Sequence, residues 1–234
     1  MSDQQPRDLS LPKDYSIPDK YWSPPGGMNG RIGDADSAAL YQAVGQALTA
    51  WGTVEEWLAS LFWTLATGEG SRPRQSPIMM TWGAIESVTP RVEITRTMAR
   101  SFKRKFPTVV DKDKKLNNLM DHLKKASWIR NDIAHGIVIG YAILPPQDQI
   151  PEGPLTLEYL MNEPIIKEKY CLKSPFFMTG RNDYFSDQSI ISDSLNFYTS
   201  GDIYTFSYKF LILRTAIITY LGELHDRLEK LPKL

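Results

Sequence analysis

The sequence predicts a mainly α-helical protein, an antiparallel helical bundle with a small β-hairpin or sheet inserted before the last helix. Three observations carry this prediction. Long stretches repeat apolar residues every three or four positions, the period of a buried helix face. Short apolar runs bounded by turn residues interrupt the pattern between about residues 137 and 175. The chain has 234 residues, of which 42% are hydrophobic and 23% charged, so it is long enough to bury a substantial core.

The first part of the chain, residues 1–34, is predicted to be an extended or disordered tail. It is rich in proline, aspartate, serine and glycine, and residues 24–27 read Pro-Pro-Gly-Gly. Such a composition buries too little apolar surface to order itself. Residues 35–234 then form a single helical domain, with the β insertion at about 137–175.

Four helical regions are expected in this domain. Asp36 or Ser37 is suited to cap the first, and Gly68 and Gly70 end it. The second is expected to bend or restart near Pro90. The last repeats apolar residues seven apart, which is typical of a packed bundle seam. The regions span about residues 36–67, 77–106, 113–135 and 199–231.

The insertion is predicted from three apolar runs bounded by turn residues. The first extends from Ile137 to Leu144 and ends at a Pro-Pro pair. Two more short strands are expected at residues 155–161 and 165–173. Residues 174–196 are polar and are expected to form a loop.

Composition excludes several classes of protein. Cys171 is the only cysteine, which rules out an intramolecular disulfide framework and is compatible with a reducing compartment. No cysteine and histidine spacing suits a zinc site, so no metal and no cofactor are expected. Residues 1–25 lack the apolar run of a signal peptide. The most apolar window, residues 210–221, is too short to span a membrane and contains Arg214. We therefore expect a cytoplasmic protein without a membrane partner.

The segment with the clearest chemistry is residues 127–136, Ser-Trp-Ile-Arg-Asn-Asp-Ile-Ala-His-Gly, at the predicted end of a helix. Arg130 can clamp a phosphate through its planar set of donors. His135, one of three histidines in the chain, can transfer a proton near neutral pH. Asn131 lies between them and shares a helix face with His135. These side chains suffice for metal-free phosphodiester chemistry.

This motif resembles the Arg-x4-6-His signature of the HEPN family, the higher eukaryotes and prokaryotes nucleotide-binding domains. Arg130 and His135 have the required spacing, and Asn131 matches the polar residue that often follows the arginine. Ala134 and Gly136 match a frequent longer form of the motif. The architectural likeness covers roughly residues 36–231, whereas the tail resembles nothing in the family.

The resemblance implies a HEPN-like bundle and a metal-independent endoribonuclease that uses the 2′-hydroxyl of RNA as nucleophile. His135 would act as general acid or base, Arg130 would neutralise phosphoryl charge, and Asn131 would orient a phosphate or the imidazole. Family ribonucleases place two such motifs across a homodimer. They often serve as toxins or defence components, which makes an antitoxin or another regulatory protein a further expected partner.

Glu55 is a candidate fourth member of the site. It falls on the apolar stripe of the first helix, four residues after Trp51 and three before Leu58. Many members of the family have a polar residue on an early helix that approaches the motif, and the resemblance gives Glu55 this role. The alternative is an ordinary solvated edge of a wide stripe, and Glu56 is the neighbouring candidate.

Positive charge gathers just before the motif. Residues 91–130 contain twelve basic and four acidic residues, a net charge of +8 in a chain that is neutral as a whole. Four of the basic residues share one helix face and are candidates for binding RNA phosphates: Arg96, Arg100, Lys103 and Arg104. The alternative is a solvated helix face.

Helix geometry leaves the motif itself open to two interpretations. Arg130 and His135 are five residues apart, or about 140° around a helix, so both can address one phosphate only if the helix loosens or a second copy contributes. A histidine followed by Gly136 is also a common helix stop, with the glycine left-handed. Besides the nuclease, two further hypotheses stand: a non-catalytic HEPN-like module that binds nucleotides, RNA or protein, and a helical scaffold.

Overall fold

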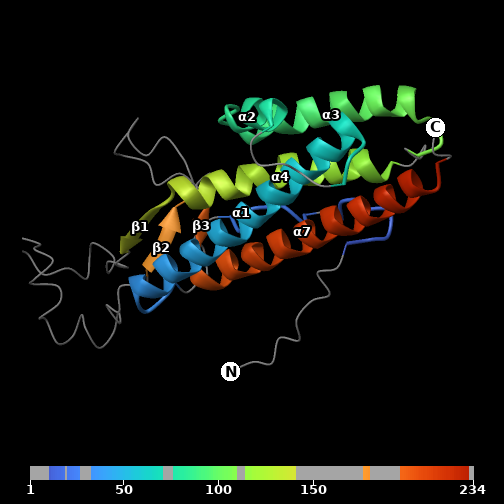
Figure 1. Cartoon of the computed structure of the whole chain (residues 1–234). Coiled ribbons are helices and arrows are strands. Elements are labelled where there is room, and N and C mark those ends of the chain that lie inside the picture. The colour runs from blue at the N-terminus through green and yellow to red at the C-terminus, as the bar shows by residue number, and fades with distance from the viewer. Residues whose placement is uncertain are drawn as a thin grey trace, which may run out of the picture.

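The structure, a computed structural model, describes residues 11–18, 20–26, 33–70, 76–109, 114–140, 176–179 and 196–231. These residues are mainly helical and include a small antiparallel sheet, as the sequence predicts (Figure 1). The elements are α1 (Ser37–Thr67), α2 (Pro77–Gly83), α3 (Val88–Lys105), α4 (Lys115–His135), β1 (Ile137–Gly140), β2 (Phe176–Thr179), β3 (Phe197–Tyr198) and α7 (Ser200–Glu229).

The helix ends have the residues that helix ends require. The Asp36 side chain caps α1 by accepting a hydrogen bond from Ala38 N at 2.8 Å. Gly68 ends the helix with a φ of 81°, a left-handed conformation that glycine adopts without a Cβ clash. At α7, Thr199 and Asp202 form a capping box. These local signals explain why the predicted bounds of both long helices are close to the observed ones.

The bundle is not purely antiparallel. Asp34 accepts a hydrogen bond from Ser200 N at 2.7 Å near the beginning of α1 and α7, and Thr64 lies 3.3 Å from His225 near the other ends. The two longest helices therefore run parallel. Helix α4 runs in the opposite direction and packs against α7 and α3 (Figure 1). The expectation of a purely antiparallel bundle is wrong in this respect.

The second predicted helical region is divided in two. Helix α2 ends at Gly83, and α3 begins at Val88 after a short connection. The break precedes Pro90, which lies in the first turn of α3, where a missing N–H has no cost. Trp82 of α2 stacks on Phe62 of α1 with ring centroids 4.5 Å apart. This contact fixes α2 against the bundle.

The sheet lies at the end of the bundle where α4 stops and α7 begins. Strand β2 pairs antiparallel with both neighbours, Val138 lies opposite Met178, and Met178 lies opposite Tyr198. Strand β1 confirms the start of the first predicted strand. The loop expected for residues 174–196 is wrong at β2, because Phe177 and Met178 are buried there. The strands expected at residues 155–161 and 165–173 lie outside the described residues.

Part of the predicted tail belongs to the core. Tyr15, Tyr21 and Trp22 are all less than 9% exposed and join the same apolar cluster as the helices. The Trp22 ring stacks on Phe210 of α7, and its indole N–H donates to Nδ1 of His122 at 2.8 Å. We call residues 11–18 and 20–26 the N-terminal strap. The expectation that this composition buries little apolar surface is wrong for the strap.

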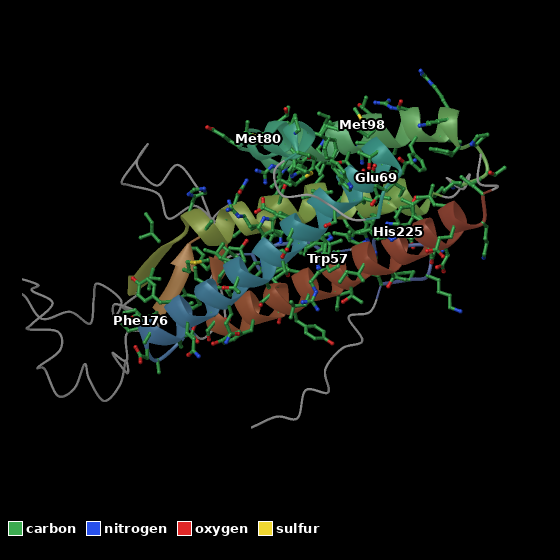
Figure 2. All side chains as sticks on the ribbon, viewed as in Figure 1. Trp57, Glu69, Met80, Met98, Phe176 and His225 are labelled. Carbon is green, nitrogen blue, oxygen red and sulfur yellow. The ribbon has the colours of Figure 1, made fainter. Side chains whose placement is uncertain are left out.

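The two ends of the bundle carry different features. Phe176 marks the sheet end, where the Arg130–His135 motif also lies, since α4 leads directly into β1. Glu69 and His225 lie toward the opposite end (Figure 2). None of the described helices is long and apolar enough to cross a membrane.

Candidate functional site

The motif occupies the last turns of α4, and its arginine faces the bundle. Arg130 follows Ala126 by four residues and precedes Ile133 by three, and both of these residues are buried. The arginine side chain is partly buried, and its Nε atom has no hydrogen-bond partner within the described part of the chain. An unpaired cation is costly to bury. The position therefore suits an anion that approaches this end of the bundle.

Asn131 holds the guanidinium of Arg130. The Nη1 atom of Arg130 donates to Oδ1 of Asn131 at 3.1 Å. An amide oxygen orients the arginine and leaves its positive charge unneutralised, unlike a carboxylate. No ion pair with a carboxylate is found for Arg130 among the described residues. Arg214 of α7 likewise has a buried Nε atom without a hydrogen-bond partner among the described residues. Unlike Arg130, it has no histidine in the adjoining helical turns.

His135 is the last residue of α4 and its side chain is exposed. Gly136 follows with φ −69° and ψ 153°, so the chain passes from the helix directly into β1. The left-handed glycine expected from the helix-stop interpretation is wrong. The glycine here extends the chain and does not close a cap, which leaves His135 at an open corner between helix and sheet.

Arg130 and His135 address different sides of α4. Their burial agrees with the angle of about 140° that five residues subtend on a helix. Arg130 points toward the packed face and His135 toward solvent. Within one chain, the structure therefore does not bring the two groups together around one phosphate.

Asp132 contributes a contact that the sequence did not reveal. Its Oδ2 atom accepts a hydrogen bond at 3.0 Å from the hydroxyl of Tyr198, a fully buried residue of β3. Burial and the negative charge of Asp132 both raise the pKa of the Tyr198 hydroxyl, so it stays a donor at neutral pH. This bond ties the motif to the start of α7. The aspartate was visible in the motif, but no local pattern identifies a tyrosine 66 residues later.

Glu55 is engaged by another residue. Its Oε1 atom lies 3.3 Å from Nη1 of Arg91, and both side chains are largely buried, with exposed fractions of 29% and 17%. The Arg91 guanidinium also lies 5.8 Å from the centre of the Trp82 ring. Glu55 is thus not a freely solvated edge of the stripe. No contact between Glu55 and the motif is found in the described parts of the chain, and Glu56 is exposed.

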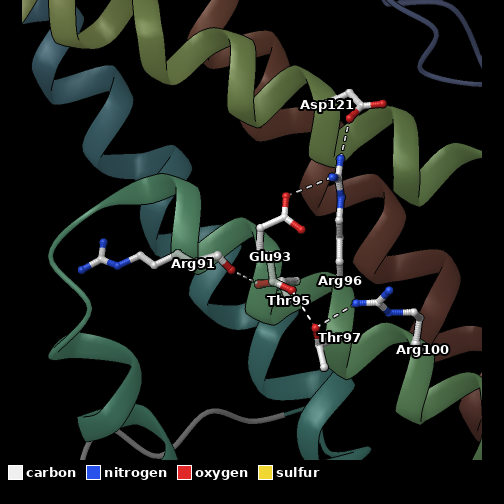
Figure 3. Close-up of polar contacts among 7 residues, drawn as sticks. All are labelled: Arg91, Glu93, Thr95, Arg96, Thr97, Arg100 and Asp121. Carbon is white, nitrogen blue, oxygen red and sulfur yellow. Dashed lines mark hydrogen bonds and ion pairs between the residues drawn. The ribbon is translucent and has the colours of Figure 1, made fainter.

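The four candidate phosphate-binding residues of α3 differ in their surroundings. Arg96 bridges Glu93, at 3.1 Å, and Asp121 of α4, and Arg100 donates to Oγ1 of Thr97 at 3.1 Å (Figure 3). Lys103 and Arg104 are exposed in the last turn. Two carboxylates therefore neutralise Arg96, while the later residues remain exposed to solvent.

The basic face leads away from the motif. Helices α3 and α4 are antiparallel (Figure 1), and Arg96 of α3 pairs with Asp121 of α4 (Figure 3). Arg104 is eight residues beyond Arg96, about 12 Å along the axis, and Arg130 is nine residues beyond Asp121 in the other direction, about 13 Å. The structure does not bring Arg104 and Arg130 together. The basic residues nearest the motif in sequence are Lys124 and Lys125 of α4 itself.

No family model, curated protein or solved structure shows significant similarity to this chain. Among the described residues, no group of three or more His, Cys, Asp or Glu side chains is arranged to hold a metal ion. The chemistry of the motif must therefore be judged from its own side chains.

Proposed function

We propose that the chain is a metal-independent endoribonuclease of the HEPN type, in which Arg130 and His135 act across a homodimer. One observation carries the proposal: among the described residues, the partly buried Arg130 donates to an amide and is paired with no carboxylate. Such a group is ready to receive an anion, and a phosphodiester is an anion that matches its donors.

The reaction would proceed through the 2′-hydroxyl of the substrate. His135 would remove the proton of that hydroxyl, the 2′ oxygen would attack phosphorus, and the bond from phosphorus to the 5′ oxygen would break. The leaving oxygen would take a proton from a second histidine. Arg130 would stabilise the negative charge that builds on the phosphoryl oxygens. The products are a 2′,3′-cyclic phosphate and a 5′-hydroxyl.

A dimer would bring together catalytic groups that a single chain keeps apart. Arg130 and His135 lie on different sides of α4, and one histidine cannot be base and acid in the same step. A two-fold axis beside the end of α4 would supply a second copy of each group. RNA is thus the proposed substrate and a second copy the proposed partner. A regulatory or antitoxin partner is an expectation of the resemblance alone.

The first test is RNA cleavage in EDTA. The purified protein is expected to cut single-stranded RNA and leave 2′,3′-cyclic phosphate ends. Arg130→Ala and His135→Ala are expected to abolish cutting while thermal unfolding stays unchanged, and His225→Ala at the opposite end of the bundle serves as the matched control. Cleavage that persists in both motif variants would overturn the assignment.

The second test addresses the dimer. If one site uses both copies of His135, a heterodimer of wild-type and His135→Ala chains contains no intact site. Random equimolar mixing of these chains should then leave about a quarter of the wild-type rate, from the wild-type dimers alone. Mixing that leaves about half of the rate, while the heterodimer forms, would contradict a shared site.

A second candidate function is a binding module without cleavage. The separation of Arg130 and His135 within one chain favours it, because an isolated arginine can hold a phosphate without any proton transfer. RNA binding that weakens with salt, in a protein that cuts no RNA tested, would support this candidate.

A further inference from the structure

Trp128 stands out among the tryptophans of the chain. All six tryptophans lie in the described part of the structure, and Trp128 alone is exposed, with 59% of its surface accessible. Four others are less than 9% exposed, and Trp57 is partly buried. Burial of an indole stabilises a fold, so leaving one in solvent forgoes that gain. An exposed indole beside a candidate site suggests that it has a ligand.

The position of Trp128 links it to the motif. It precedes Asn131 by three residues and His135 by seven, so the three side chains lie on one side of α4. Two helical turns, about 10 Å along the axis, separate it from His135. Lys124, one turn earlier, continues the same line, and Lys125 lies beside it. This side of α4 thus presents, in order along the helix, a cation, an aromatic ring, an amide and an imidazole.

The carboxylates on this side of α4 are engaged by other residues. Asp121 pairs with Arg96, and Asp132 accepts the hydroxyl of Tyr198. Asp121 is therefore paired with a cation, whereas Asp132 keeps its negative charge and directs Oδ2 at the Tyr198 hydroxyl.

This composition favours a nucleic acid over a protein surface. The centres of protein interfaces are depleted in lysine, whereas surfaces that bind single strands combine cations for the backbone with aromatic rings for the bases. A duplex keeps its bases stacked on each other, so a lone exposed indole fits an unpaired base.

We propose that Trp128 is a stacking platform for an unpaired base of RNA, adjacent to the nucleotide whose phosphate meets the motif. Lys124 and Lys125 contact the backbone beside that base. The inference rests on the proposed function for its substrate class, and it makes single-stranded RNA the preferred substrate. Trp128 is in this role a positioning residue, because it holds a base and touches no reacting atom.

Binding is measured first, in the His135→Ala background, with a fluorescein-labelled single-stranded oligouridylate and a duplex of equal length. Trp128→Ala should weaken single-strand binding about tenfold and leave duplex binding unchanged, since stacking on an aromatic side chain contributes about 1–3 kcal/mol per base. Trp128→Phe should retain most of the affinity. Tyr208→Ala, which removes an aromatic residue 56% exposed on α7, is the matched control and should change nothing.

Two further readouts separate this proposal from the proposed function. In the catalytically intact protein, Trp128→Ala should raise KM and leave kcat unchanged, because stacking is equal in ground state and transition state. Bound RNA should also quench the most solvent-accessible tryptophan emission, and Trp128→Ala should remove that quenching.

Three outcomes would overturn the stacking role. If the wild-type protein cuts RNA and Trp128→Ala binds and cuts equally well, the platform is wrong and the proposed function stands. If Trp128→Ala lowers the fraction of dimer in sedimentation, Trp128 is an interface residue between copies. If the wild-type protein neither binds nor cuts RNA, both proposals fail together.

Discussion

The two halves of α4 meet the same residue types in opposite circumstances. His122, near the middle, is fully buried and accepts a hydrogen bond from Trp22, whereas His135, at the end, is exposed. Arg96 reaches α4 from α3 and meets two carboxylates, whereas the partner of Arg130 among the described residues is an amide. In the first part, carboxylates pair with the Arg96 charge and Trp22 bonds to His122, although Nε of Arg96 and Nε2 of His122 have no partner among the described residues. The other part presents groups that the fold leaves available.

This difference separates residues that support the fold of this chain from residues that are available for its activity. A side chain satisfied by its own fold should affect stability when it is changed, and an available one should affect activity. The first and second halves of α4 therefore serve as controls for each other.

The largest effect is expected at Arg130. Arg130→Met should lower RNA cleavage by about 10³-fold, since a preorganised donor to the phosphoryl charge is lost. The free energy of unfolding should stay unchanged or rise slightly, because a cation that no described carboxylate pairs with leaves a partly buried position. Initial cleavage rates and urea unfolding measure the two quantities. Arg96→Met should give a nearly normal rate, and equal losses of rate in the two variants would contradict the division.

The second effect is acid destabilisation through His122. Burial lowers the pKa of its imidazole from 6.5 to about 4, and the backbone at Ser16 and Tyr15 opposes this only in part. Lys125 and Asp121 act on it with opposite signs. Below pH 6.5 the imidazole binds a proton in the unfolded chain but stays neutral in the folded chain. The contribution of His122 to the free energy of unfolding is therefore fully present above pH 6.5. About 3 kcal/mol of it is lost as the pH falls to 4.

Urea unfolding across this pH range tests the assignment to His122. His122→Asn keeps an acceptor for the Trp22 indole and does not titrate, so its stability should depend less on pH. His135→Ala should retain the full pH dependence. The same acid loss in His122→Asn as in the wild type would show that another group is responsible.

The third effect concerns the pair of Arg91 and Glu55. Arg91→Met should destabilise the protein by about 1–2 kcal/mol, because it leaves a largely buried carboxylate unpaired and removes the cation from the Trp82 ring. Glu55→Gln in the same chain should recover part of this loss. A double-mutant cycle by urea unfolding measures the coupling. If Glu55→Gln alone abolishes cleavage without changing stability, Glu55 has a role in the reaction.

The smallest effect is expected at the far end of the basic face. Lys103→Ala with Arg104→Ala should change cleavage less than about twofold, since these residues lie far along the bundle from Arg130. Lys124→Ala with Lys125→Ala should instead reduce the steepness of log affinity against log salt by about 1.4, since each phosphate contact on a single strand contributes about 0.7. If the Lys103 and Arg104 pair has the larger effect, RNA approaches the motif over the basic face of α3.

The sequence predicts the helices well because their signals are local. Asp36, Gly68 and Thr199 mark helix ends through their own conformational preferences, and the apolar period indicates the buried faces. Strand β2 was not predictable, because Phe177 and Met178 become a strand only by pairing with β1 and β3. The strap was missed for the same reason, since the partners of Trp22 are His122 and Phe210.

The candidate site divides in a similar way. The spacing of Arg130 and His135 predicts their separation around α4, because both lie on one regular helix. The partners of Glu55 and Arg96 belong to other helices, 36 and 25 residues away, and only packing decides which charges meet. The sequence likewise could not predict that the basic face of α3 leads away from the motif, because this depends on the antiparallel packing of α3 and α4.

The docking of the strap constrains the order in which the chain can fold. Lys209 of α7 donates to the carbonyl oxygen of Tyr21, and Phe210 stacks on Trp22. The strap is thus synthesised well before α7, which supplies part of its contacts. Until α7 is made, the strap has only its contacts with earlier helices, such as that of Trp22 with His122 of α4. Ordering of the strap is consequently a late event, and it closes the chain only once synthesis has reached α7.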